Sequence, residues 1–192
     1  MKRFLFFMAL LCIWCISFNS VKAVSNAELQ DTSRFEHIVS KGDTGGGDGK
    51  YIELSTLRDI STDARTKNIE TKIYVVLPSS DLIREYTIRY DYNLNYSFAN
   101  LVAKMPEFKQ RFPDFSLNDI WNLKMDDSGI IGTIKAQQDY TLNGESKLTQ
   151  PGYKGYEHVT FLTPTDFDFE SYHVANRVFK KVFGIFYDDV IR

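Results

Sequence analysis

Hydrophobic and polar residues alternate most regularly in residues 83–92, where the apolar positions are Tyr86, Ile88, Tyr90 and Tyr92. A period of two is typical of a β-strand with one buried face. The apolar, β-branched run at residues 73–77 indicates a second strand, buried on both faces. The same pattern places further strands at residues 51–56, 130–142, 145–149 and 156–162.

Turn signals separate these segments. Residues 78–81, Pro-Ser-Ser-Asp, have the composition of a tight turn between two strands. Asn143-Gly144 is a strong signal for a two-residue hairpin between residues 130–142 and 145–149. The polar stretch at residues 58–68 is expected to hold at most a helical turn.

A helical period replaces the alternation in the middle of the chain. Ser97 is placed to cap a helix with apolar positions at Phe98, Leu101, Val102 and Met105. Pro106 ends that helix and begins a short second one over residues 107–112. Ser116 is a second capping residue, and the apolar positions Leu117, Ile120 and Trp121 predict the buried stripe of a third helix.

A long C-terminal helix begins within residues 163–168. Its apolar face consists of Tyr172, Ala175, Val178, Phe179, Val182, Phe183 and Phe186. Strands at both ends and helices in the middle predict the α+β class. We expect an antiparallel sheet of two strand groups, including the hairpin meander, packed with the helical middle segment and the C-terminal helix.

The first 23 residues have the pattern of a secretory signal peptide. A basic start, Met1-Lys2-Arg3, precedes an apolar run over residues 4–18, and small residues follow at Val21 and Ala23. The apolar run is shorter than the roughly 20 residues that a membrane-spanning helix needs. We therefore expect cleavage after Ala23, a periplasmic or secreted protein, and no stable membrane insertion after cleavage.

The remaining chain divides into a leader and one domain. Residues 24–49 include the glycine-rich segment at residues 42–49 and predict a flexible lead-in, within which residues 35–39 could form a short strand or a helical turn. Residues 50–192 form the single α+β domain.

Cleavage changes the composition of the exported chain. Both cysteines, Cys12 and Cys15, lie in the signal peptide, so the mature domain has no disulfide, thiolate nucleophile or thiolate metal ligand. An exported domain without cysteine favours a bacterial source. The net charge of the whole chain is −2, and removing Lys2, Arg3 and Lys22 makes it more negative. This acidity argues against nucleic-acid binding and favours a protein partner with a basic surface.

The residues that carry chemistry are few. The sequence has 3 histidines without metal-ligand spacing, and it has no motif for a cofactor, so we expect neither a metal nor a cofactor. An exported hydrolase remains the alternative function. It would use His158 or His173 with the nearby carboxylates Asp166 and Asp168, if folding brings these side chains together.

Aromatic residues are the more informative candidates. Tyr96 follows the strongest strand, and Tyr153 ends the polar loop at residues 143–153. Tyrosine suits protein contacts because a rigid ring buries much area and has one polar edge. We expect Tyr96 and Tyr153 to bind a partner protein. The predicted function is that of an exported, non-enzymatic protein-binding domain, such as an inhibitor or immunity protein or an accessory subunit of a secretion or surface system.

Overall fold

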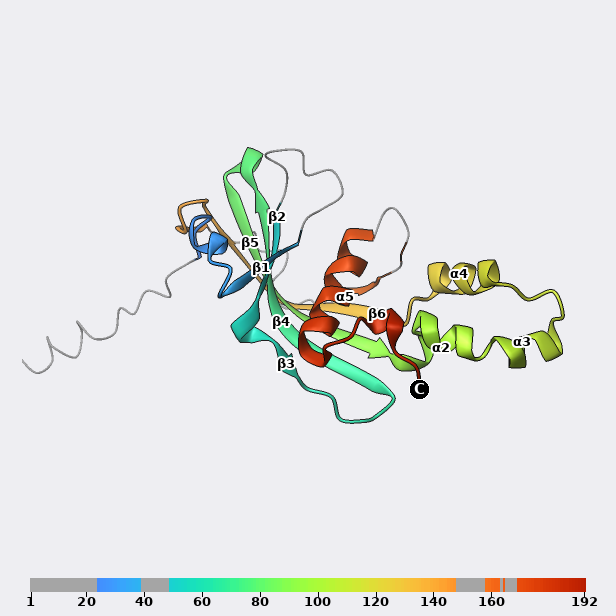
Figure 1. Cartoon of the computed structure of the whole chain (residues 1–192). Helices are drawn as coiled ribbons and strands as arrows, with labels where there is room; N and C mark the ends of the chain where they lie inside the picture. Colours follow the sequence, from blue (N-terminus) through green and yellow to red (C-terminus); the bar gives the residue numbers. More distant parts are fainter. Residues whose placement is uncertain (1–23, 39–48, 148–157, 163, 165–168) are drawn as a thin grey trace, which may run out of the picture.

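The computed structural model describes residues 24–38, 49–147, 158–162, 164 and 169–192. In these residues eight strands form one curled antiparallel sheet (Figure 1). The strands are β1 (Phe35–Ile38), β2 (Gly49–Glu53), β3 (Arg58–Asp59), β4 (Thr66–Leu77), β5 (Leu82–Asn93), β6 (Ile130–Tyr140), β7 (Ser146–Lys147) and β8 (His158–Phe161). With the helices described below, the sheet confirms the predicted α+β class.

The order of the strands along the sheet is β1-β2-β4-β5-β6-β7, with β3 beside β4 and β8 beside β6. The centre of the sheet is the β4–β5 hairpin, in which Thr66 is paired with Asn93 and Leu77 with Leu82. The predicted turn at residues 78–81 closes this hairpin through the 3-10 helix η3 (Pro78–Ser80). Asn143-Gly144 also lies in the turn between β6 and the short strand β7. The turn is longer than the predicted two residues, because strand pairing ends at Tyr140 and Ser146.

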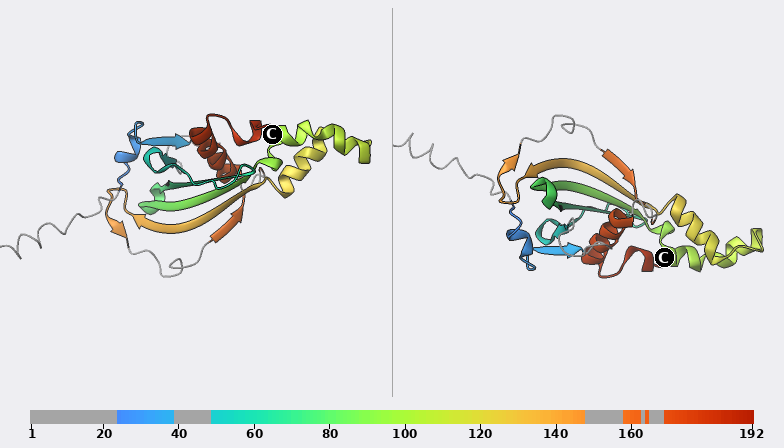
Figure 2. Two further views of the ribbon diagram at one scale, coloured as in Figure 1. Left: turned by 90° about the horizontal axis from the view of Figure 1, so that it is seen from below. Right: turned by 90° about the horizontal axis from the view of Figure 1, so that it is seen from above.

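Three helices lie between β5 and β6: α2 (Phe98–Ala103), α3 (Met105–Arg111) and α4 (Leu117–Asp126). Both predicted caps are present. The Ser97 hydroxyl accepts a hydrogen bond from the Asn100 amide at 3.3 Å, and Ser116 forms a capping box with Asp119. These helices form an arm that protrudes from one end of the sheet (Figure 2). We call residues 97–127 the helical arm.

The C-terminal helix α5 (Phe169–Phe183) covers one face of the sheet. Tyr92 connects the two layers, because its hydroxyl donates to the carbonyl of Ala175 at 2.8 Å and its ring lies 4.9 Å from the ring of Phe179. Tyr187, in the 3-10 helix η6 (Tyr187–Asp189), completes this aromatic cluster. The alternation in β5 therefore identified a core face, with Tyr90 and Tyr92 buried.

A second core lies on the opposite face of the sheet. Its buried members are Val24, Leu29, Phe35, Tyr51, Tyr74, Val76, Ile83 and Tyr140. Residues 24–38, which the sequence placed in a flexible lead-in, supply three of these side chains: Val24, Leu29 of the 3-10 helix η1 (Glu28–Gln30) and Phe35 of β1. β1 lies where the sequence allowed a short strand or a helical turn. The packing of residues 24–34 was missed because their apolar residues are widely spaced and match neither a helical nor a strand period.

Two further predictions differ from the structure. Residues 58–68 contain the short strand β3 and the start of β4. In α4, only Ile120 of the predicted stripe is buried, and Leu117 and Trp121 are exposed. The reason is that α4 belongs to a protruding arm and has a narrow contact with the rest of the domain.

Candidate functional site

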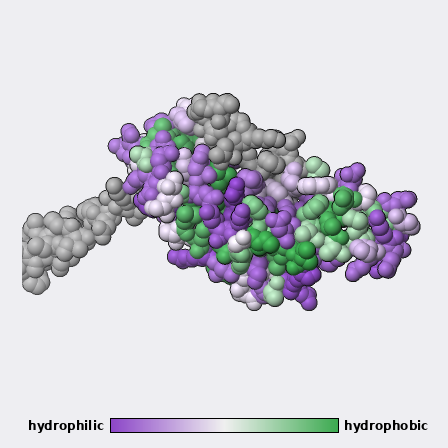
Figure 3. All heavy atoms as spheres, in the orientation of Figure 1, coloured by the Kyte–Doolittle hydropathy of each residue, from purple (hydrophilic) through white to green (hydrophobic). Residues whose placement is uncertain are grey.

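The helical arm presents apolar side chains to solvent. The exposed fraction of the side chain is 63% for Phe112 and 50% for Trp121, and Leu117 and Met125 are similarly exposed. Figure 3 shows hydrophobic residues on the arm and on the adjoining part of the domain. We call Phe112, Leu117, Trp121 and Met125 the arm surface. Several exposed apolar side chains on one protruding element are typical of interaction sites.

The geometry of α4 explains the arm surface. Leu117, Trp121 and Met125 are four residues apart, so they follow one another along one side of the helix. Ile120 and Lys124 occupy the neighbouring buried side. The Trp121 ring packs against Phe98 of α2 at 4.8 Å between centroids, so one side of the indole is held in place and the other stays exposed.

A shallow groove of about 550 Å³ lies between α3 and α4, at the Leu117 end of the arm surface. Met105, Phe115 and Leu117 supply its apolar part. Lys109 and Asp114 supply a cation and an anion. The phenyl rings of Phe108 and Phe115, whose centroids are 4.9 Å apart, hold α3 against the start of α4.

The arm is anchored to the sheet by a buried cation. The Lys124 ammonium donates to the carbonyls of Tyr96 at 2.9 Å and Ser128 at 2.8 Å, and forms an ion pair with Asp188 at 2.8 Å. Its Nζ atom also lies 4.8 Å from the centre of the Tyr187 ring. Burial lowers the pKa of Lys124, and the charge of Asp188 opposes that shift. With every ammonium donor satisfied, this lysine has a structural role.

The C-terminal segment supports the same junction. The Asp188 carboxylate accepts the Phe98 amide at 3.2 Å, and Ser97 donates from its hydroxyl to the Val190 carbonyl at 2.6 Å. Tyr187 donates to the carbonyl of Asn93 at 2.7 Å. These contacts fix α2 to the end of the chain, so the arm surface projects from a rigid base.

The predicted partner-binding residues occupy different positions. Tyr96 is partly buried in the 3-10 helix η4 (Leu94–Tyr96), and its carbonyl accepts from Lys124 at the base of the arm. Tyr153 lies outside the described residues. The role of these two tyrosines in binding stays a prediction.

The alternative catalytic residues are only partly described by the structure. His158 is in β8, where its backbone is paired with Ile134. His173 is half-buried in α5, and its pKa is lowered by burial and by the charge of Arg177. Asp166 and Asp168 lie outside the described residues. Among the described residues, no group of three or more histidine, cysteine and acidic side chains is arranged to hold a metal ion.

Sequence reasoning found the helices of the arm but missed its exposed face. The signal was present in the 117–121–125 spacing, which predicts an apolar side of α4. Spacing alone does not show whether such a side faces the core or solvent.

Comparison with known proteins identifies no significant match to this chain. The chain matches no protein-family model, and no curated protein or solved structure is significantly similar to it. Within the described part of the chain, every helix is too short or too polar to cross a membrane.

Proposed function

We propose that this protein is an exported, non-enzymatic binding domain that recognises another protein through the arm surface. The observation that carries the proposal is the row of exposed apolar side chains on an arm fixed to the domain by the buried Lys124. A preorganised surface binds more tightly because little conformational entropy is lost on association. Exposed aromatic anchors such as Trp121 are the residues that most often dominate binding energy.

Charge defines the chemistry of the partner. Asp114 lies beside Leu117 at one end of the arm surface, and Asp126 and Asp127 follow Met125 at the other. The partner therefore has an apolar depression for Leu117 and Trp121, with basic side chains at both ends facing these carboxylates. Lys109 and Arg111, on α3, add a place for one acidic side chain of the partner.

The biological setting of the proposal follows from the sequence. Cleavage after Ala23 delivers the chain to the periplasm or the medium, where a small binding domain acts as an inhibitor or immunity protein or as an accessory subunit of a secretion or surface system. Sequencing the N-terminus of the exported protein tests this step, and a first residue other than Val24 would contradict it.

The binding surface is tested by photocrosslinking in the cells that produce the protein. A photoreactive amino acid replaces Asn118 or Asn122, which are exposed beside the arm surface. Ser79, exposed in the turn between β4 and β5, is the control position. We expect an adduct with a second exported protein from positions 118 and 122 only, and its loss in the Trp121→Ser variant.

The captured protein is then purified and its binding measured through Trp121 fluorescence. Trp121 and Trp14 are the 2 tryptophans of the chain, so Trp121 alone remains after the expected cleavage. Binding should shift its emission to the blue. The Asp114→Lys/Asp126→Lys variant should bind more slowly and with less dependence on salt, whereas the exposed control Glu145→Lys should bind like the wild type.

Three outcomes would overturn the proposal. They are the absence of an adduct at positions 118 and 122, an adduct between two copies of this chain, and a blue shift of Trp121 with anionic lipid vesicles but with no protein.

A further inference from the structure

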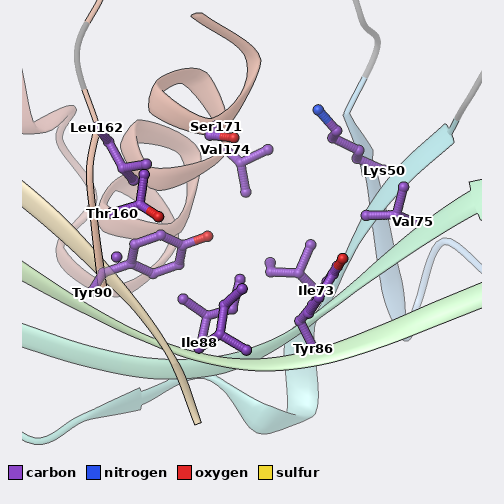
Figure 4. A pocket seen from close by; sticks show the side chains of 12 residues that line it. Lys50, Ile73, Val75, Tyr86, Ile88, Tyr90, Thr160, Leu162, Ser171 and Val174 are labelled. Carbon is purple, nitrogen blue, oxygen red and sulfur yellow. The ribbon is translucent and has the colours of Figure 1, made fainter. Parts of the chain in front are cut away.

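A second candidate site shares no residue with the arm surface. A cavity of about 270 Å³ lies between the curved sheet and the first turns of α5 (Figure 4). Most of its wall is apolar and comes from Ile73, Val75, Ile88, Ile134, Leu162 and Val174. An apolar pocket with few polar groups is the usual form of a small-molecule site.

A few polar side chains line the cavity, and Tyr90 is the most deeply buried of them. Tyr90 is 3% exposed, and its hydroxyl extends into the cavity (Figure 4). Within the described part of the chain, no hydrogen bond to this hydroxyl is formed, and the Tyr90 ring lies 6.1 Å from the ring of Tyr92 between centroids. A hydroxyl that faces a cavity and has no partner in the protein can donate a hydrogen bond to a ligand that carries an acceptor.

The backbone leaves the space beside this tyrosine open. Tyr90 is paired with Gly132 of β6, and a Cβ atom on Gly132 would lie 3.7 Å from the Tyr90 ring and 3.4 Å from Leu162. The absence of a side chain at residue 132 therefore keeps one wall of the cavity back from the ring. Thr160 of β8 adds a second hydroxyl-bearing side chain near Tyr90 (Figure 4).

We propose that this cavity binds a small, mostly apolar molecule with one carbonyl oxygen, which accepts a hydrogen bond from the Tyr90 hydroxyl. A cavity of about 150 Å³ holds one benzene ring, so a proportionate ligand here has about ten non-hydrogen atoms. The ligand is a ring or short chain with a single acceptor, and its apolar part contacts Ile73, Ile88 and Val174. This site is separate from the arm surface and goes beyond the proposed protein binding.

The test compares two probes that differ in one group. Butyrophenone has a phenyl ring, a carbonyl and a propyl chain, and butylbenzene has the same shape without the carbonyl. Binding to the full mature chain is measured by NMR titration or calorimetry. We expect saturable binding of butyrophenone, and three- to tenfold weaker binding of it by Tyr90→Phe, because one neutral hydrogen bond is lost. The affinity for butylbenzene should be equal in the two proteins.

Two further variants separate the site from the fold. Val174→Phe fills the cavity and should abolish binding of both probes. Tyr140→Phe, the same change in the core on the opposite face, should bind butyrophenone like the wild type. Tyr90→Phe should fold at least as stably as the wild type, because it removes an unpaired hydroxyl.

Each contrary result rejects the proposal. Failure of both probes to saturate means that the cavity holds only water. Unchanged binding by Val174→Phe places the probes elsewhere on the protein. Equal affinity of Tyr90→Phe and the wild type for butyrophenone rules out the Tyr90 hydrogen bond.

Discussion

Gly129 and Gly184 adopt nearly the same left-handed backbone conformation, with φ of 76° and 78°, but their surroundings differ. A side chain on Gly129 would collide with Tyr96 and with the hydroxyl of Tyr187, whereas Gly184 faces open space. Gly184→Ala should therefore lower the free energy of unfolding by about 1–2 kcal/mol, the cost of the backbone conformation alone. Gly129→Ala should cost about 1–3 kcal/mol more because the junction must rearrange. Urea denaturation of both variants measures the difference, and equal losses would contradict the packing described for the base of the arm.

Lys124 provides a second prediction at the same junction. Lys124→Met leaves the Asp188 carboxylate without its cation, and breaking a buried ion pair in this way costs about 3–5 kcal/mol. The matched control is Lys147→Met, which removes a more exposed ion pair with Asp81 and should cost no more than about 1 kcal/mol. Chemical denaturation gives both values. The double variant Lys124→Met/Asp188→Asn should recover part of the loss, and additive losses in that variant would argue against a direct Lys124–Asp188 interaction.

Local rules were sufficient for some residues and not for others. Ser97 and Ser116 were identified as helix caps because capping depends on neighbours within three residues. Lys124 could not be identified, because lysine is rarely buried and its three acceptors come from distant or irregular segments. Tyr90 was assigned correctly to the core face of its strand. The cavity beside its hydroxyl could not be predicted, because it depends on how α5 packs against the sheet.

At the level of elements, the strands were predicted best where alternation is regular. β5 extends over residues 82–93 against a prediction of 83–92. β4 begins at Thr66, earlier than its apolar run, because Lys67 and Asn68 are polar residues carried into the sheet by pairing with β5. β4 is therefore longer than the local sequence pattern predicted, because pairing with β5 extends it at its N-terminal end.

The arm helices lead to a prediction about α4. Leu117 and Trp121 are exposed, so Leu117→Ser/Trp121→Ser should lower the free energy of unfolding by about 1 kcal/mol or less. Ile120→Ala, on the buried side of the same helix, should cost about 2–5 kcal/mol because it leaves a cavity. Thermal unfolding of the two variants compares them directly. A larger loss for the exposed pair would mean that these side chains stabilise the fold, and it would remove the argument that they are kept for a partner.

For the whole molecule, the main correction to the sequence analysis is that the sheet is covered on both faces. The periodicity of α5 indicated one covering layer. The other layer is built from residues 24–38, whose backbone is joined to distant parts of the chain: Asn26 donates to the Leu142 carbonyl at 2.9 Å, and Leu54 donates to the Arg34 carbonyl at 2.8 Å. Such long-range contacts leave no periodic pattern in the sequence of this segment. Its polar and glycine-rich composition therefore led to the interpretation of a flexible leader.

This second layer predicts that the fold depends on residues 24–33. A chain that starts at residue 34 lacks Val24 and Leu29 and exposes the apolar side chains beneath them, including Phe35 and Tyr74. We expect a lower melting temperature and binding of a hydrophobic dye to the uncovered face. Leu29→Ala in the chain that keeps residues 24–33 gives a milder test if the shortened chain does not fold, and it should cost about 2–5 kcal/mol because Leu29 is almost completely buried. Deletion of the exposed Ile191 and Arg192 at the other end is the control, and it should change the melting temperature far less. An unchanged melting temperature in the Leu29→Ala variant would contradict the packing of residues 24–38 on this face of the sheet and support the interpretation of a flexible leader.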